Sequence, residues 1–592
     1  MSAVAKIWRL PPHDAAGIRS LTESMSVSPI IAQLLLNRGV RTAEEGKRFL
    51  DAPLVGLHSP ALMPGIAEAV DRLAQAVADK RRICIYGDYD VDGVTGTAIL
   101  WGLLNLLGAS VEYYVPHRME EGYGLNDEAL KKIAERGGQV VVTVDCGIAS
   151  LTEADTAREL GLELIITDHH EMKDTLPAAA VLVHPRLPGS QYPFGGISGA
   201  GVAFKLAWAL AMKISGSEKV NANLREYLMD AVALAALGLI ADVVPLRDEN
   251  RIYARAGLAR LREKPPIGMK ALIESAGLAA NAQLRAEDVG FRLAPRMNAA
   301  GRLGYAGLVV EMLTTANEKR AKEIAMHLEN ENGARQTLER RMTQQAKDMM
   351  EGEDLAKWPA IVLSHPEWHP GVIGIVAGRL VDHFGRPVLI IAAKEGQPIA
   401  TGSGRSIPGF VLHEALNACS QDLLGHGGHA MAAGFKIAPS RIPAFRERFL
   451  AHAAQHFPHG APPAPCLDLD GEAPLSMLTL GLMKDIARLE PYGADNPKPR
   501  FMAGDLTIEG EPRKVGTGER TLQFRVRQGT TIMKAVGFGM GERIEELMSA
   551  GGKCCVVFSP LINEWQGRRS VEIQVTDFQP GATAKFETLK QI

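Results

Sequence analysis

Three aspartates that alternate along a short segment are the sharpest chemical feature of the sequence. The segment GDYDVDGVTGT carries Asp88, Asp90 and Asp92 between an apolar run and a helical pattern. Residues two apart on an extended segment point the same way, so these carboxylates would converge and repel one another. A divalent cation relieves that repulsion, and the segment therefore predicts a metal site. The alternatives are an acidic turn, a helix cap or an EF-hand loop, although the glutamate of an EF-hand's twelfth position is missing.

Further polar residues close other apolar runs. They are Asp145 in VVVTVDCG, the trio Asp168, His169 and His170 in LIITDHHE, and Asp242 after the run at 231–241. Ligands of open parallel α/β sheets bind beyond the carboxyl ends of the strands, so we expect these side chains to share one crevice. Asp242 would add a fourth element end to the three strand ends. A helix cap is the alternative for Asp145 and Asp242, and a purely structural role is the alternative for the histidines.

The residue types of this set indicate which ion it would hold. Carboxylates with one imidazole and no thiolate suit Mn²⁺ or Mg²⁺ better than zinc, and the imidazole favours Mn²⁺. Four or five carboxylates favour two divalent cations over one. Two such ions about 3.5 to 4 Å apart polarise a phosphodiester and stabilise its leaving oxygen. The set therefore predicts phosphoester hydrolysis.

The pattern around these residues predicts the elements that position them. Short β-rich runs alternate with helical patterns from about residue 81 to 168, which is the rhythm of a parallel α/β sheet. The proline-free, charged stretch 315–350 predicts one long helix or two joined helices. A second α/β pattern follows and ends in glycine-rich stretches. Beyond the proline-rich HGAPPAPC, five β-rich runs predict a small barrel of the OB type.

These patterns divide the chain into seven parts. They are an N-terminal segment (1–54), the acidic α/β domain (55–260), a basic region with the connecting helix (261–354), the second α/β domain (355–455), a linker (456–466), the barrel (467–582) and a tail (583–592). At 592 residues the chain has the length of three or four domains.

Composition and charge exclude several classes of protein. With 46% hydrophobic residues, 22% charged residues and a net charge of −3, the chain is neither disordered nor histone-like. Residues 81–250 carry 14 Lys and Arg against 23 Asp and Glu, a net of −9, whereas residues 251–350 carry 17 against 11, a net of +6. An acidic segment suits metal ions and a basic one suits polyanions.

The cysteines and the apolar runs bear on compartment. The six cysteines form no C-x-x-C pair, which argues against a zinc site and a disulfide framework. The longest apolar run covers 11 residues and is too short to span a membrane, and the first dozen residues lack the apolar region of a secretory signal. We therefore expect a cytoplasmic protein without membrane association.

Four motifs together resemble those of the DHH/DHHA1 phosphoesterase family. They are GDYDVDGVT, TVDCG, TDHHE and GGHAMAAG, in this order. The resemblance covers roughly residues 50 to 580, and the terminal barrel makes it strongest to the family's single-strand-specific 5′→3′ DNA exonucleases. It implies an α/β fold, with a parallel-sheet DHH domain and a DHHA1 domain joined by a long helix and a C-terminal OB-fold. It also implies single-stranded DNA as substrate and a role in DNA repair and recombination. The partners that it implies are a single-strand binding protein and a helicase. We expect the protein to be a monomer.

The resemblance also implies roles for individual residues. The implied metal ligands are Asp90, Asp92, Asp145, His169 and Asp242, with Asp145 bridging. Asp88 and Asp168 would orient those ligands, and His170 would contact the scissile phosphate or assist the leaving group. The implied contacts to substrate phosphates are Arg296, Arg302, Arg405, Ser406, Gly428 and His429. Surface arginines and a structural glycine-rich turn are the alternatives for this second group.

One position departs from the family's pattern, since His184 stands where the family often has Asn. No implied ligand is replaced, which favours an active enzyme. A smaller phosphodiesterase for short oligoribonucleotides or cyclic dinucleotides is one alternative, but such enzymes lack the terminal barrel. A non-catalytic single-strand binding protein is another, and the intact acidic set counts against it. The candidate strand contacts of the barrel are Phe524, Arg525, Arg527, Phe538, Trp565, Arg568 and Arg569.

Overall fold

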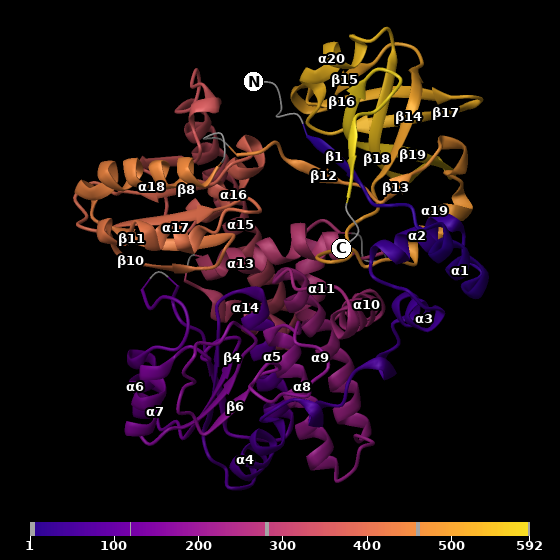
Figure 1. Ribbon diagram of the computed structural model, residues 1–592. Coiled ribbons are helices and arrows are strands. Elements are labelled where there is room, and N and C mark those ends of the chain that lie inside the picture. Colours follow the sequence, from indigo (N-terminus) through magenta and orange to yellow (C-terminus); the bar gives the residue numbers. More distant parts are fainter. Residues whose placement is uncertain (1–5, 119, 279–282, 303, 458–461, 590–592) are drawn as a thin grey trace. The chain divides into compact units, whose positions relative to one another are not determined.

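The computed structural model describes residues 6–118, 120–278, 283–302, 304–457 and 462–589 (Figure 1). The chain forms two compact units. The first combines residues 14–332 with residues 481–499, and the second combines the N-terminal residues through His13 with residues 333–480 and the chain from Arg500 onward. Residues 458–461 of the predicted linker and 590–592 of the predicted tail lie outside the described ranges.

A five-stranded parallel sheet forms the centre of the first unit. Its order is β3-β2-β4-β5-β6, and every neighbouring pair is parallel. The strands are β2 (Ile83–Gly87), β3 (Val111–Tyr114), β4 (Val140–Val144), β5 (Glu163–Thr167) and β6 (Val181–Val183). The parallel α/β sheet predicted from the sequence is confirmed.

Helices cover both faces of this sheet because its strands alternate their side chains between two cores. Ile83 and Ile85 of β2 join one apolar cluster, whereas Cys84 and Tyr86 join the other. The first cluster lies under α4 (Ile66–Ala78), α5 (Val91–Leu106), α8 (Gly199–Ser215) and α9 (Ala222–Ala241). The second lies under α6 (Asp127–Glu135) and α7 (Leu151–Glu159), on the opposite side of the sheet (Figure 1).

The order of the strands creates a switch point between β2 and β4. The chain leaves β2 toward β3 on one side and then returns to form β4 on the other side. Because the connections diverge there, the carboxyl ends of β2 and β4 border the crevice where α/β sheets bind ligands. The predicted Asp242 differs from the other candidates: the apolar run before it belongs to helix α9, so Asp242 caps a helix and does not end a strand.

A buried arginine attaches residues 481–499 to the first unit. Arg251 of α10 (Asp248–Glu263) is 1% exposed, and its guanidinium lies 3.9 Å from the centre of the Phe49 ring. It donates hydrogen bonds to the carbonyl oxygens of Phe49, Arg488, Leu489, Glu490 and Pro491. Burial lowers the pKa of Arg251 to about 9. The segment thus folds onto α10, although it lies between barrel residues in the sequence.

The second unit begins within the long helix predicted for residues 315–350. That stretch forms the single helix α15 (Glu318–Asp348). A mixed sheet follows with the order β10-β11-β9-β8-β7, in which only β7 and β8 are parallel. Its strands are β7 (Ile361–His365), β8 (Val388–Ala392), β9 (Ala400–Arg405), β10 (Leu423–Gly428) and β11 (Ala432–Ile437). Helix α16 (Ile373–Phe384) covers one face, and α17 (Leu412–Ala418) and α18 (Ile442–His456) cover the other.

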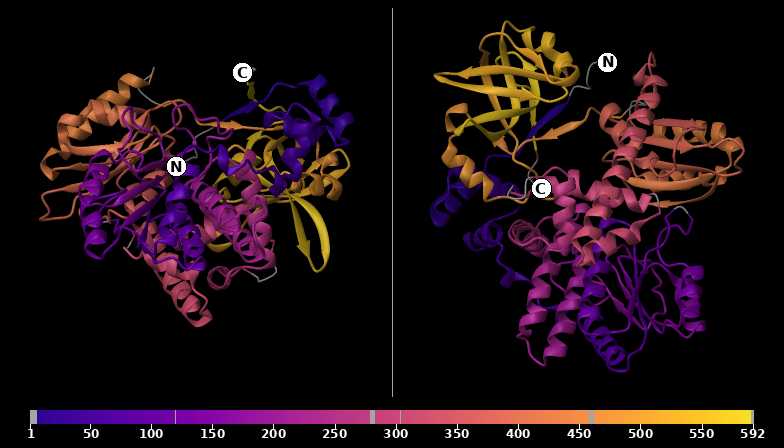
Figure 2. Two further views of the ribbon diagram at one scale, coloured as in Figure 1. Left: turned by 90° about the horizontal axis from the view of Figure 1, so that it is seen from below. Right: turned by 180° about the vertical axis from the view of Figure 1, so that it is seen from behind.

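The C-terminal strands close into a barrel, as the sequence predicts. The order β14-β18-β19-β17-β16 returns to β14 through a β14–β16 pairing. The five strands are β14 (Phe501–Ile508), β16 (Thr521–Gln528), β17 (Thr531–Gly537), β18 (Lys553–Trp565) and β19 (Arg568–Pro580). Figure 2 shows them in yellow from two further directions. Closure removes the free sheet edges, and the β17–β19 pair is parallel, as in an OB-fold.

A small parallel sheet joins three distant segments of the second unit. Its central strand β1 (Ile7–Leu10) pairs with β12 (Cys466–Asp468) and with β20 (Phe586–Thr588). Such pairings have no local sequence signal, and the sequence did not predict them. Within the described ranges, no helix is both long and apolar enough to cross a lipid bilayer.

A buried ion pair in the first unit yields a test of the fold. Lys205 of α8 and Glu249 of α10 are both fully buried, and Lys205 also donates to the carbonyl oxygen of His58. Removing one partner of a buried pair leaves the other charge unpaired, which costs about 3–5 kcal/mol.

We expect Lys205→Met to lower the free energy of unfolding by about 3–5 kcal/mol, measured by urea denaturation, because Glu249 would stay buried without its cation. The matched control is Lys213→Met on the same helix, since the Lys213–Asp71 pair is exposed and worth at most about 1 kcal/mol. Equal small losses in both variants would show that the buried pair contributes no more than a surface pair.

Candidate metal centre

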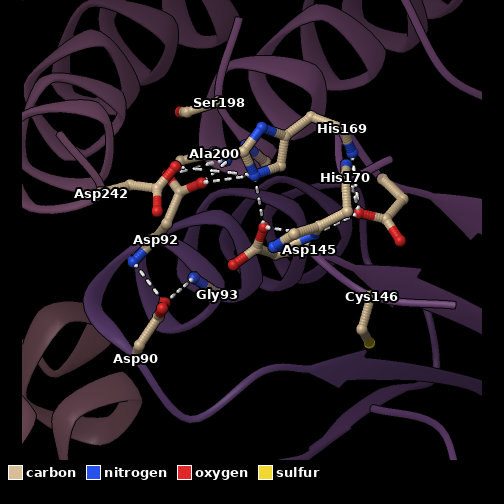
Figure 3. A network of polar contacts seen from close by, with 12 residues as sticks. Asp90, Asp92, Gly93, Asp145, Cys146, His169, His170, Ser198, Ala200 and Asp242 are labelled. Carbon is tan, nitrogen blue, oxygen red and sulfur yellow. Dashed lines mark hydrogen bonds and ion pairs between the residues drawn. The ribbon is translucent and has the colours of Figure 1, made fainter. Parts of the chain in front are cut away.

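The segment after β2 brings two of its three aspartates to the start of α5. Asp90 is the N-cap of α5, and its carboxylate accepts hydrogen bonds from the amides of Asp92 and Gly93 (Figure 3). Asp92 lies in the first turn, where the helix dipole favours a negative charge. Asp88 directly follows β2, is 2% exposed, and has one carboxylate oxygen without a hydrogen-bond partner among the described residues.

A second helix start holds the carboxylate of Asp92. The amides of Gly199 and Ala200, at the N-terminus of α8, donate to its two oxygens at 2.6 and 3.1 Å. These helices approach closely because their contact residues are small. A Cβ atom at Gly238 of α9 would lie 2.4 Å from an oxygen of Asp92, and one at Gly199 would lie 2.5 Å from an oxygen of Asp145. Larger residues at either glycine would displace the carboxylates.

Asp145 follows β4 in a backbone conformation that few residues adopt. Its φ is +64°, in the left-handed region, which Asp and Asn tolerate better than most residues. The side chain is 3% exposed, and its Oδ1 lies 3.1 Å from Nε2 of His169. The angles do not suit a hydrogen bond, and both atoms lack a partner within the described part of the chain. Two buried polar atoms thus face each other without satisfying one another.

The residues after β5 form a tight local network. Asp168 accepts hydrogen bonds from the amides of Ile148, His169 and His170, and also from Nδ1 of His170 at 2.8 Å. Burial by itself would raise the pKa of Asp168, but the hydrogen bond and charge of His170 and the Ile148 amide lower it to about 2. Burial likewise opposes the charge of His170, yet the contact with Asp168 raises the pKa of His170 to about 9.

Side chains from three other elements converge on the ring of His169. Its Nε2 lies 3.1 Å from Asp145, 3.6 Å from Asp242 and 3.9 Å from Asp92 (Figure 3). Ligand atoms within 4.8 Å of one another occur in three sets: Asp92, His169 and Asp242; Asp145, His169 and His170; and Asp88, Asp90 and Asp145. Seven of the eight candidates of the predicted cluster thus belong to these sets, and Asp145 and His169 each belong to two of them. The eighth, Asp168, contacts the cluster through its hydrogen bond with His170.

The electrostatics of the cluster are unfavourable without a cation. Burial and the neighbouring carboxylates raise the pKa of Asp92 to about 7 and that of Asp242 to about 8. The same causes hold the pKa values of Asp88 and Asp145 well above the usual range. Burial and the charge of His170 lower the pKa of His169 to about 3, so its ring is neutral and Nε2 is able to act as a ligand.

The donor set fits divalent cations. Asp88 Oδ1, Asp145 Oδ1 and His169 Nε2 are buried without hydrogen-bond partners among the described residues, and native structures seldom leave such atoms unsatisfied. Carboxylate oxygens with one neutral imidazole, and no thiolate in the three sets, suit Mn²⁺ or Mg²⁺. Cys146 stands next to Asp145, but its thiol is buried, and burial holds its pKa well above the usual value.

The two basic candidates of the first unit differ in their surroundings. Arg296 lies in α13 (Ala294–Arg302), forms an ion pair with Glu329 and donates to the carbonyl oxygen of Arg292. Its guanidinium is thus already engaged within the protein. Arg302 ends the same helix, and its charge acts on the phenol of Tyr89, in the loop between Asp88 and Asp90. Arg302 therefore lies near the segment that carries Asp88 and Asp90.

The four candidates of the second unit gather where its mixed sheet ends. Arg405 is the last residue of β9 and pairs with Ala432, and Gly428 ends β10 and pairs with Ala433. The exposed His429 follows, and its amide donates to the carbonyl oxygen of Ala432. Ser406 is different, since it is 4% exposed and its hydroxyl donates to the carbonyl oxygen of Phe410. That contact gives Ser406 a structural role in the turn.

Sequence reasoning missed several residues that support the cluster. Ser198 caps α8 and thereby fixes the amides that bind Asp92. The run GISGAGVAF across the start of α8 carried a signal for this, because a serine followed by small residues is typical of a helix start that another group approaches closely. The ring of His184 donates to the carbonyl oxygen of His170 at 2.9 Å. The guanidinium of Arg186 donates to the carbonyl oxygen of His169. These two contacts hold the DHH turn.

Comparison with known protein families gives three matches along the chain. The DHH family, N-terminal domain, matches residues 82–236, the DHHA1 domain matches residues 358–455, and the RecJ OB domain matches residues 469–577. They occur in the order and on the elements that the sequence motifs indicated.

Individual proteins are similar over nearly the whole chain. The single-stranded-DNA-specific exonuclease RecJ of Bacillus subtilis is 39% identical over 96% of this chain and 70% of its own length. The protein of the same name from Dickeya dadantii is 36% identical over 98% of this chain and 100% of its own length. The crystal structure of RecJ in complex with Mn²⁺ from Thermus thermophilus matches with a TM-score of 0.82 and 34% identity, covering 98% of this chain and 80% of that one. The chain therefore belongs to the RecJ family of DHH/DHHA1 phosphoesterases.

Proposed function

We propose that this protein is a metal-dependent exonuclease that degrades single-stranded DNA from the 5′ end and releases 5′-mononucleotides during DNA repair and recombination. The observation that carries the proposal is the cluster of buried, unsatisfied carboxylate and imidazole atoms at the switch point of the DHH sheet. Relatives that share nearly the whole chain are named as single-stranded-DNA-specific exonucleases. The OB barrel supports the substrate class, because such barrels bind single strands.

In this proposal Asp90, Asp92, Asp145, His169 and Asp242 hold two divalent cations, Mn²⁺ or Mg²⁺, with Asp145 shared between them. Among the carboxylates of the three ligand sets, Asp145 alone belongs to two, which supports that role. His169 also belongs to two sets, but a neutral imidazole offers a single acceptor nitrogen. When bound, two such cations lower the pKa of a water and neutralise charge that develops on the phosphodiester. The resemblance to a RecJ crystallised with Mn²⁺ supports the choice of ion.

The remaining residues of the cluster orient ligands and handle a proton. Asp168 fixes the backbone of both histidines and keeps His170 protonated through Nδ1. The second ring nitrogen of the imidazolium, Nε2, then carries a proton that can be donated to a phosphate oxygen or to the leaving oxygen. Asp88 lies in one set with Asp90 and Asp145 and would orient the ligands from beside them. His170 is 34% exposed at its side chain, which leaves it accessible from the crevice.

For the substrate strand, Arg302 of the first unit and Arg405 and His429 of the second provide contacts to phosphates. Arginine grips phosphate with two donors, which suits a strand that must be held in one register. In the barrel, Trp565 ends β18 and is 70% exposed, and Arg568 and Arg569 begin β19. Exposed aromatic and cationic side chains together are the usual means of holding single strands. A single-strand binding protein and a helicase remain the proposed partners of a monomeric enzyme.

The decisive experiment for the activity uses 5′-labelled and 3′-labelled single-stranded DNA and the matching duplex, with Mn²⁺. We expect rapid release of labelled mononucleotide from the 5′-labelled single strand, slow loss of the 3′ label, and little cleavage of the duplex. Cleavage confined to dinucleotides or cyclic dinucleotides would favour a smaller-substrate phosphodiesterase, and binding without cleavage would favour a non-catalytic strand-binding protein.

The role of Asp145 predicts a loss of metal binding on substitution. Asn is the appropriate replacement because it tolerates the positive φ of this residue. Saturating Mn²⁺ should raise the melting temperature of the wild type by several degrees, since a ligand at 100 times its Kd stabilises the native state by about 2.7 kcal/mol. In Asp145→Asn we expect most of that shift and all nuclease activity to disappear.

The matched control for Asp145 is Asp155→Asn, which replaces an exposed carboxylate paired with Arg158 on helix α7. This variant should keep the full response to Mn²⁺ and full activity. A Mn²⁺ shift in Asp145→Asn equal to that of the wild type would remove Asp145 from the ligand set.

The role of His170 predicts that catalysis and metal binding separate. In His170→Gln we expect kcat on single-stranded DNA to fall by roughly 10²–10⁴-fold, because general acid catalysis contributes about that factor. The Mn²⁺-induced rise in melting temperature should stay close to that of the wild type, since His170 is not among the proposed ligands. An unchanged kcat would contradict the role, and a lost Mn²⁺ response would make His170 a ligand.

A further inference from the structure

A pocket of about 470 Å³ lies in the first unit, apart from the carboxylate cluster. Three segments line it: residues 255–262 of α10, residues 283–287, and residues 484–498. The cluster lies at the end of α9, whereas Arg255 and Arg262 lie roughly 10 and 21 Å beyond the start of α10, at 1.5 Å per residue. No aspartate or histidine of the cluster lines this α10 pocket.

Positive charge dominates the rim of the α10 pocket. The cationic side chains that line it are Arg255, Arg262, Arg285, Lys484, Arg488 and Lys498. Two carboxylates oppose these six cations, and one of them, Glu490, lies 3.9 Å from Arg285 and is balanced by it. The remaining surplus of positive charge favours an anionic occupant.

The floor of the α10 pocket is apolar. Leu258, Leu284 and Ala286 contribute buried side chains, and the half-buried ring of Tyr492 closes one side. The Tyr492 hydroxyl donates to the carbonyl oxygen of Ile486 at 2.7 Å, which fixes the ring. A cationic rim over an apolar floor suits a ligand that carries an anionic group attached to a flat, weakly polar ring.

The wall of the pocket is held rigidly by the core of the unit. Arg251 lies on the same helix as Arg255 and Arg262 and binds the carbonyl oxygens of residues 488–491 from the buried side. The backbone that carries Lys484 and Arg488 is thereby fixed against α10, and its cations are presented in one arrangement. Preorganisation of this kind lowers the entropy lost on binding.

We infer that the α10 pocket binds one phosphate-bearing nucleotide, at a site separate from the metal centre. Its volume lies within the range of about 300 to 1,000 Å³ that is typical of small-molecule sites. Four of the six cations are arginines. Arg255 donates to the carbonyl oxygen of Leu50, Arg262 pairs with Glu263 and Arg285 pairs with Glu490. Among the described lining residues, Arg488 therefore offers the planar guanidinium whose paired donors match a phosphate. The occupant is either a free 5′-mononucleotide or one nucleotide of a single strand, since both offer the same phosphate and base. The inference goes beyond the proposed function and requires no catalysis.

The test measures nucleotide binding by isothermal titration calorimetry to the full chain carrying Asp145→Asn, without metal. Thymidine 5′-monophosphate, hexathymidylate or both should bind, and thymidine without phosphate should not. Adding Lys484→Glu and Arg488→Glu should raise the Kd at least about tenfold, because two of the four exposed cations of the rim are reversed. The matched control is Arg225→Glu, which reverses an exposed cation of α9 outside the pocket and should leave the Kd unchanged.

Titration with hexathymidylate distinguishes a free 5′-mononucleotide from one nucleotide of a single strand. Equal affinity for monomer and hexamer indicates the free nucleotide, and binding of the hexamer alone, weakened by the pocket substitutions, indicates a strand. Equal Kd values in the pocket variant and the Arg225→Glu control would overturn the inference. Binding of an oligo-aspartate peptide in place of both nucleotides would overturn it too and would make the pocket a peptide site.

The outcome is independent of the metal centre. With Asp145 intact, the Lys484→Glu and Arg488→Glu variant should keep the wild-type rise in melting temperature on addition of Mn²⁺, which also verifies that it folds. A negative result for the pocket therefore leaves the proposed exonuclease activity to be judged by its own cleavage assay.

Discussion

Mutual repulsion among buried carboxylates is the constraint on which the first unit depends. Asp88, Asp92 and Asp145 are each at most 2% exposed and lie within one small volume with Asp90 and Asp242. In a medium of low dielectric such charges interact strongly, and burial adds a further cost for each. The raised pKa values of these groups express that cost. A fold that keeps them together must compensate part of the charge and leave the rest for a cation.

The parallel sheet supplies that partial compensation through its helix starts. The N-terminus of α5 binds Asp90, and the N-terminus of α8 binds Asp92, so backbone dipoles rather than side-chain cations face the carboxylates. A Lys or Arg at the same place would neutralise the site and exclude a metal ion. Amides stabilise the charge without occupying the side of each carboxylate that faces His169. The scaffold thus tolerates the cluster and keeps it open to ligands.

The sequence predicted the parts of this arrangement that depend on short-range pattern. Alternating aspartates after a β-rich run, and polar residues that close the next runs, place the ligands because parallel strands end at one edge of a sheet. The long helix α15 and the five barrel strands were also predicted from local sequence pattern. Asp242 was placed correctly near the others, yet the eleven-residue apolar run before it has no periodicity that separates a buried strand from a buried helix.

Contacts between residues far apart in sequence could not be predicted. The amides that bind Asp92 come from residues 107 and 108 positions further along the chain, and Arg251 binds carbonyl groups more than 230 positions away. Neither the segment that supplies these amides nor the segment that supplies these carbonyl groups has an unusual local sequence pattern. The small sheet of β1, β12 and β20 likewise joins segments whose individual β-propensity is unremarkable.

Comparison of the buried charges distinguishes structural sites from the functional one. Arg251 is as deeply buried as Asp145, yet it donates to carbonyl oxygens of five residues and needs no counterion. Lys205 and Glu249 satisfy one another directly. A buried charge with a structural role is stable only when hydrogen bonds or an opposite charge satisfy all of its polar atoms. Asp145 and His169 instead retain unsatisfied atoms that lie 3.1 Å apart, and Asp88 retains one in the set that it forms with Asp90 and Asp145. Such unsatisfied atoms cost stability, and binding of a cation at the cluster offsets that cost.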